Sequence, residues 1–141
     1  FKAVSKRNTK ETSPLVDATV MAGFPSPAEQ YTEAPLDLNE LLVKHPAATF
    51  FVRAAGDSMI DAGIRPGDIL VVDRSMEPHD GAVVIAALDG EFTVKFFRND
   101  GAGVRLEASN RRYKPIIPDG EAELRIFGVV TAVIHKFEAA Q

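Results

Sequence analysis

The sequence predicts a mainly β protein, an antiparallel β domain with one short helix and an extended N-terminal arm. Three observations support this fold class. Short runs rich in Val, Ile and Phe alternate with turn signals over most of the chain, as expected of antiparallel strands joined by hairpins. One stretch near residue 37 carries a complete helix start signal. The first 22 residues are polar, without a sustained apolar period, and 141 residues suffice for one domain with its own core.

Residues 1–22 are predicted to form a flexible arm, because their composition offers little apolar surface to bury. The composition changes at Ala22-Gly23. The next residues, Gly23–Pro27, contain two prolines, which exclude a helix and favour an extended linker as far as Pro35. The predicted organisation is therefore an arm over residues 1–22 and a β domain over residues 23–141.

The helix is expected from Leu38 to about Lys44. Asp37 can cap it, and Glu40, three residues later, completes a capping box. Leu36 and Leu41 form a hydrophobic staple around it. The His45-Pro46 pair ends it, because a residue before proline avoids helical geometry.

The rest of the chain indicates strands. Asp89-Gly90 is the strongest hairpin signal in the sequence. If these two residues form the loop, counting outward sets Val84 opposite Lys95. Alternation then puts Lys95 on one face of its strand with Phe97, and Val94 and Phe96 on the other face. The expected strands cover residues 49–54, 69–73, 82–88, 91–97, 104–108 and 124–134.

Composition excludes several classes of function. The net charge of -4 and the pI near 5.4 argue against a surface built to neutralise nucleic-acid phosphates, and the basic cluster at residues 111–114 is predicted to be a solvated turn. No apolar run approaches the roughly 20 residues that cross a membrane. The absence of cysteine fits a reducing cytoplasm. The three histidines are far apart, so neither a metal site nor a cofactor is expected.

Two residues carry the candidate chemistry. Lys95 lies inside the otherwise apolar run Phe92–Phe97, where it is either an edge charge that prevents aggregation or a desolvated amine with a lowered pKa. Ser58 follows Gly56-Asp57 after an apolar run; it is either a turn residue or a nucleophile whose oxyanion is bound by nearby backbone N–H groups. Together they match the Ser–Lys variant of the serine nucleophile. A Ser-His-Asp triad is disfavoured, because the second glycine of the nucleophile elbow is missing.

The chain resembles the UmuD proteins, which belong with the LexA-like self-cleaving proteins. The similarity runs from about residue 20 to residue 135. The blocks that carry it are residues 23–28, 36–39, 45–46, 56–61, 67–68, 72–73, 89–95 and 127–130.

The resemblance implies a β fold like that of LexA and the signal peptidases, with Ser58 as nucleophile and Lys95 as general base. The scissile bond would be Ala22-Gly23, at the arm boundary that composition indicates. It also implies a cytoplasmic protein of the SOS response that forms a homodimer. The RecA filament on single-stranded DNA would stimulate cleavage, and the product would be the accessory subunit of an error-prone translesion polymerase of the UmuC type.

LexA repressors carry an N-terminal DNA-binding domain, for which residues 1–22 leave no room, so direct sequence-specific DNA binding is not expected. The arm is interpreted as a removable regulator of a partner-binding surface. Two alternatives stay open. One is a non-proteolytic dimeric module that regulates a polymerase partner; the other, a signal peptidase relative, would need a membrane anchor, and none is visible.

Overall fold

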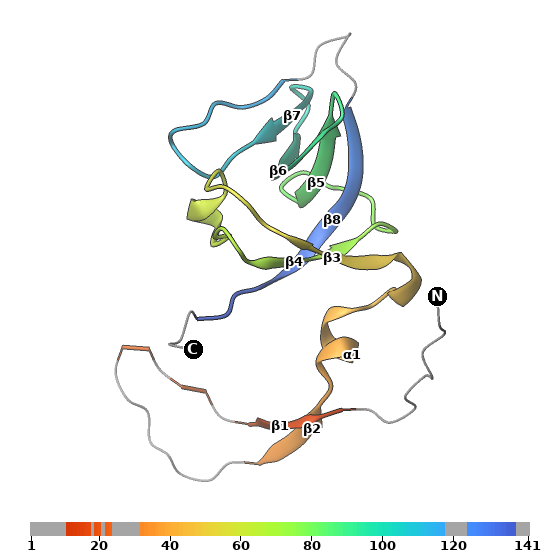
Figure 1. Cartoon of the computed structure of the whole chain (residues 1–141), viewed down its shortest axis with the longest axis vertical. Coiled ribbons are helices and arrows are strands. Elements are labelled where there is room, and N and C mark those ends of the chain that lie inside the picture. The colour runs from red at the N-terminus through yellow and green to blue at the C-terminus, as the bar shows by residue number, and fades with distance from the viewer. Residues whose placement is uncertain (1–10, 18, 21, 24–31, 118–123, 138–141) are drawn as a thin grey trace. The chain divides into compact units, whose positions relative to one another are not determined.

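The computed structural model describes residues 11–17, 19–20, 22–23, 32–117 and 124–137 (Figure 1). The chain divides into two compact units, Phe1–Val43 and Lys44–Gln141. The first contains a two-stranded sheet and the short helix α1, and the second contains a six-stranded sheet. The predicted fold class, mainly antiparallel β with one short helix, is confirmed for the described residues.

The N-terminal unit is built on a strand pair that the sequence did not predict. Strand β1 (Ser13–Val16) pairs antiparallel with β2 (Glu33–Leu36). Part of the predicted flexible arm is therefore a strand, and this correction has a physical reason: its partner lies some twenty residues away, so no local period reveals the pairing. The boundary between the units, after Val43, differs from the predicted division at residue 22, which concerns cleavage and stays a prediction. Residues 24–31 of the predicted linker lie outside the described residues.

Helix α1 (Leu38–Leu42) begins where the capping box predicts. The Asp37 side chain accepts hydrogen bonds from the backbone N–H groups of Asn39 at 2.9 Å and Glu40 at 3.3 Å, which satisfies two of the donors left free at a helix start. The helix ends two residues before the expected end at Lys44, because Val43 is already extended, with φ -116° and ψ 96°. No helix in the described part of the chain is long and apolar enough to span a membrane.

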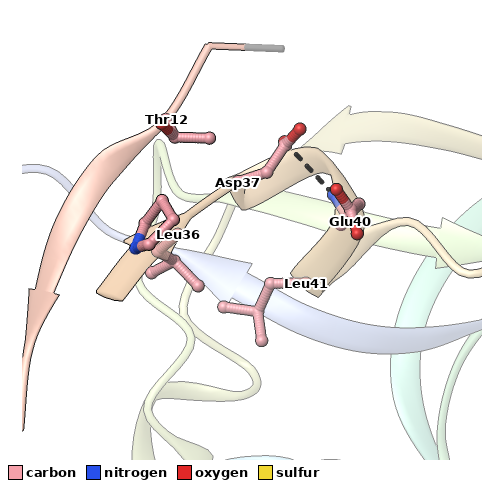
Figure 2. A pocket seen from close by; sticks show the side chains of 6 residues that line it. Thr12, Leu36, Asp37, Glu40 and Leu41 are labelled. Carbon is pink, nitrogen blue, oxygen red and sulfur yellow. Dashed lines mark hydrogen bonds between the residues drawn. The ribbon is translucent and has the colours of Figure 1, made fainter. Parts of the chain in front are cut away.

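A surface pocket of about 360 Å³ lies beside α1 within the N-terminal unit. The two leucines of the predicted staple, Leu36 and Leu41, both line it, below the capping interaction of Asp37 (Figure 2). Its complete lining is Thr12, Pro35, Leu36, Asp37, Glu40 and Leu41. None of the predicted catalytic residues belongs to this pocket.

The C-terminal unit is a single antiparallel sheet with the strand order β3-β4-β8-β5-β6-β7. All six strands lie within two residues of their predicted bounds. The strands are β3 (Thr49–Arg53), β4 (Ile69–Asp73), β5 (Val83–Leu88), β6 (Glu91–Asn99), β7 (Val104–Glu107) and β8 (Leu124–Ile134). Two 3₁₀ turns precede and follow β3, namely η1 (Pro46–Ala48) and η2 (Ile60–Ala62).

The hairpin between β5 and β6 has the predicted two-residue loop. Asp89 and Gly90 have φ values of 50° and 84°, the left-handed pair that a type I′ turn requires and that glycine adopts without strain. Val84 is the pairing partner of Lys95, as the outward count predicts. The position of Lys95 on β6 is therefore set by the local turn sequence.

Strand β8 joins the two halves of the sheet, because it pairs with β4 along one part and with β5 along the other (Figure 1). The pairing register shifts between Val71 and Val72 and again between Ile85 and Ala86, and such bulges bend a strand. Between these shifts Gly128 permits a close approach, since a Cβ there would lie 2.6 Å from the Val72 Cγ1.

Two apolar clusters, which take alternate residues of β5 and β6, stabilise this unit. The first contains Met59, Val72 and Ile85, and the second contains Val84 and Phe97. Burying one such side chain contributes about 1.5–3 kcal/mol. Lys95 is buried on the face of β6 that Phe97 shares, which confirms the predicted alternation.

Candidate active site

Ser58 lies in the loop that connects β3 to η2. The chain turns at Gly56, whose φ of 78° is a left-handed value that glycine adopts without strain. Met59, the next residue after Ser58, is 2% exposed and packs in the first apolar cluster, so it anchors the loop. Ser58 itself is half-buried. The local structure thus holds a serine hydroxyl at a turn fixed by an apolar neighbour.

The fold brings Lys95 to this serine across 37 positions of sequence. The Lys95 Nζ lies 3.0 Å from the Ser58 Oγ. Lys95 is 7% exposed, and no ion pair involves it within the described ranges. The first of the two interpretations of Lys95, an exposed edge charge, is therefore wrong, and the desolvated amine is correct.

Burial lowers the pKa of Lys95 below its ordinary value of 10.5, because desolvation disfavours the ammonium form. Nζ also lies 2.5 Å from the Thr93 Oγ1 and 3.1 Å from the Val94 carbonyl oxygen. A neutral amine has two N–H donors and one lone pair. When these two oxygens accept the donors, the lone pair is left for the Ser58 O–H. This arrangement suits proton transfer from serine to lysine.

Thr93 is the neighbour that the sequence did not assign to the site. Alternation along β6 places it on the same face as Lys95, and this was the available signal. In the sequence, Thr93 does not differ from any other strand threonine. Only the contact of its hydroxyl with the Lys95 Nζ sets it apart.

Free backbone donors surround the candidate nucleophile. In the described part of the chain, the N–H groups of Asp57, Ser58 and Met59 donate no hydrogen bond. Donors left free beside a serine can bind the oxyanion that forms when the hydroxyl attacks a carbonyl. The loop therefore offers both a nucleophile and stabilisation for the charge that its attack creates.

The three histidine side chains contact residues other than Ser58 and Lys95. His45 contacts Asp73 and His135 contacts Asp68, each at 2.6 Å, whereas His79 lies 2.9 Å from the Asp80 carbonyl oxygen. None of these contacts involves Ser58, so no Ser-His-Asp triad forms among them.

The predicted scissile residues, Ala22 and Gly23, belong to the N-terminal unit. Both are exposed and lie in a bend of the chain. A protease acts on exposed backbone of this kind, since the cut segment must enter the site in an extended form. The assignment of this bond stays a prediction.

An antiparallel β unit with a buried lysine on a serine hydroxyl defines the class of Ser–Lys hydrolases. Comparison with known proteins then gives the family. Residues 14–131 match the family described as Peptidase S24-like, and the chain belongs to this family.

Named relatives agree with this result. The chain is 48% identical to Protein SamA of Salmonella typhimurium over 95% of its own length and 93% of that protein. It is 51% identical to Protein MucA of Escherichia coli over 79% of its length and 77% of that protein. The chain is 36% identical to the LexA repressor of Proteus mirabilis over 91% of its own length and 63% of the repressor. The resemblance to UmuD-type proteins is confirmed, and the protein is a self-cleaving serine peptidase of this type.

Proposed function

We propose that the chain cuts its own Ala22-Gly23 bond, with Ser58 as nucleophile and Lys95 as general base. The observation that carries this proposal is the 3.0 Å contact between the buried Lys95 Nζ and the Ser58 Oγ. A hydroxyl attacks a peptide carbonyl only when a base takes its proton, and an amine serves as that base only when it is neutral. Burial lowers the pKa of Lys95 and so favours the neutral amine.

The reaction proceeds through an acyl-enzyme. Neutral Lys95 takes the proton of Ser58, and Oγ bonds to the carbonyl carbon of Ala22, whose oxygen becomes an oxyanion beside the free N–H groups of the loop. The C–N bond to Gly23 then breaks, and Lys95 returns the proton to the leaving amine. Water next attacks the ester, gives one proton to Lys95 and releases residues up to Ala22 as a carboxylic acid, which loses its remaining acidic proton to solvent. The proton that Lys95 holds restores the Ser58 hydroxyl.

We infer the biological setting from the family. In this proposal the RecA filament on single-stranded DNA stimulates the cut in the cytoplasm. The product that begins at Gly23 forms a homodimer and acts as the accessory subunit of an error-prone translesion polymerase of the UmuC type. The support is the membership of the Peptidase S24-like family together with the extensive identity to SamA and MucA.

The test uses the full chain with RecA, single-stranded DNA and a nucleotide that keeps the filament active. Intact-mass measurement is expected to show a product that begins at Gly23, and the Ser58→Ala variant is expected to remain whole. A wild-type chain that stays uncut under these conditions, but still binds a UmuC-type polymerase, would favour the non-proteolytic module instead.

A further inference from the structure

The loop that carries Ser58 is held by a second segment, residues 109–113, which follows β7. Two backbone hydrogen bonds join them. The Ser109 N–H donates to the Ser58 carbonyl oxygen, and the Asp61 N–H donates to the Ser109 carbonyl oxygen, both at 2.8 Å. The two segments are thus paired on either side of the candidate nucleophile, and neither shifts without breaking these bonds.

Two side chains of the same segment hold Asp57, the residue directly before Ser58. The Asn110 Nδ2 donates to the Asp57 carbonyl oxygen at 2.8 Å. The Tyr113 hydroxyl donates to the Asp57 Oδ1 at 2.7 Å. Asp57 is therefore fixed through its backbone and its carboxylate at once, more than fifty positions away in sequence from both donors.

The turn at residues 110–113 dictates the orientation of Asn110. Its Oδ1 accepts from the Arg112 N–H at 3.0 Å, and its backbone carbonyl accepts from the Tyr113 N–H at 3.1 Å. Because the side-chain oxygen is occupied within the turn, the amide nitrogen is the atom that faces Asp57. Asn110 thus builds the turn that presents Tyr113 and also donates to the nucleophile loop.

The pKa values of Tyr113 and Lys95 are shifted in opposite directions by their surroundings. The hydrogen bond with Asp57, and then the charge of that carboxylate, raise the pKa of Tyr113 above its ordinary value. Burial lowers the pKa of Lys95. Both shifts favour a state in which Lys95 is neutral while Tyr113 still holds the phenolic proton that it donates to Asp57.

We propose that Asn110 and Tyr113 are positioning residues for self-cleavage. By holding Asp57, they keep the Ser58 Oγ within hydrogen-bonding distance of Lys95 and leave the N–H groups of the loop free for the oxyanion. The inference rests on the proposed function, in which Ser58 is the nucleophile. The basic side chains at this turn, Arg111, Arg112 and Lys114, are exposed, as predicted; the positioning role belongs to the uncharged Asn110 and Tyr113.

The test compares Tyr113→Phe and Asn110→Asp in the full chain, without RecA, over a range of alkaline pH. The first variant removes one donor; the second keeps the oxygen that the turn needs but loses the amide donor. A slightly misplaced nucleophile reduces the plateau rate of cleavage by about 10- to 100-fold. For Tyr113→Phe, which adds no charge, the pH at half-maximal rate is expected to stay that of the wild type. Arg112→Gln is the control, expected within about twofold of the wild type, since its side chain is 81% exposed and 3.9 Å from Asp57.

A second readout separates positioning of the serine from docking of the arm. Diisopropyl fluorophosphate forms a bond between the Ser58 Oγ and phosphorus, with loss of fluoride and transfer of the proton to Lys95, and it does not require the arm. Both variants are expected to be labelled more slowly, by a factor similar to the loss of cleavage. Thermal unfolding shows which variants are folded at the assay temperature, and either one alone tests the proposal.

Three results have distinct meanings. Slow cleavage with wild-type labelling would place these residues in arm docking and overturn the proposal. Wild-type rates in both assays would overturn it as well. A wild-type chain that neither cleaves at Ala22-Gly23 nor reacts with the reagent would instead contradict the proposed function, on which the inference depends.

Discussion

Raising the pH is the perturbation that acts most directly on Lys95. Burial lowers the pKa of this amine below 10.5, and only the neutral form accepts the Ser58 proton. Well below the pKa, the neutral fraction increases about tenfold for each pH unit. The rate of spontaneous self-cleavage is therefore expected to rise with pH at up to about tenfold per unit and to reach half of its plateau below pH 10.5, the ordinary pKa of lysine.

The assay follows the intact chain and the fragment that begins at Gly23 by mass, with purified protein alone at fixed ionic strength. Circular dichroism at each pH confirms that the chain stays folded. A rate that does not change between neutral and alkaline pH would refute the role of Lys95 as base. A half-maximal rate at or above pH 10.5 would refute the role of burial, since it would indicate an ordinary lysine.

Three further predictions concern the same unit. Thr93→Val removes a hydrogen-bond acceptor of the Lys95 amine, so the plateau rate of cleavage should fall about tenfold. Thr93→Ser keeps the hydroxyl and should retain the wild-type rate. Equal rates for both variants would show that the hydroxyl does not orient the amine. Lys95→Met should raise the midpoint of urea unfolding at pH 7, because the folded state disfavours the charged amine and binds its proton less tightly than the unfolded chain does. The gain in stability over the wild type should shrink as the pH rises toward 10.5. A gain independent of pH would contradict the buried-amine explanation. Gly128→Ala should destabilise the fold by about 1–3 kcal/mol in urea unfolding, because its Cβ would lie 2.6 Å from the Val72 Cγ1; the cost should be smaller in a Val72→Ala background, and an equal cost in both would show that this contact is not the cause.

Local signals predicted much of the fold. The capping box at Asp37 located the start of α1, and the Asp89-Gly90 turn set the register that pairs Val84 with Lys95. Both features depend on residues that are neighbours in sequence, where turn and cap chemistry are decisive. Strand β1 was missed because its stability comes from a distant partner strand.

The candidate site was only partly predictable, for the same reason. Ser58 and Lys95 were identified with the help of the family resemblance, but their contact depends on the folding of the whole sheet. The supporting side chains were not identified at all. Asn110 and Tyr113 lie in a turn whose polar composition suits solvent equally well, and only its pairing with the Ser58 loop distinguishes it.

The proposed function requires that this chain contain all the groups needed to cut its own arm. The most direct measurement is the intact mass of the wild-type, Ser58→Ala and Lys95→Ala chains after incubation alone at alkaline pH. We expect a product that begins at Gly23 from the wild type and no product from either variant. Cleavage of the Ser58→Ala chain at the same bond, or a wild-type product that begins at another residue, would contradict it.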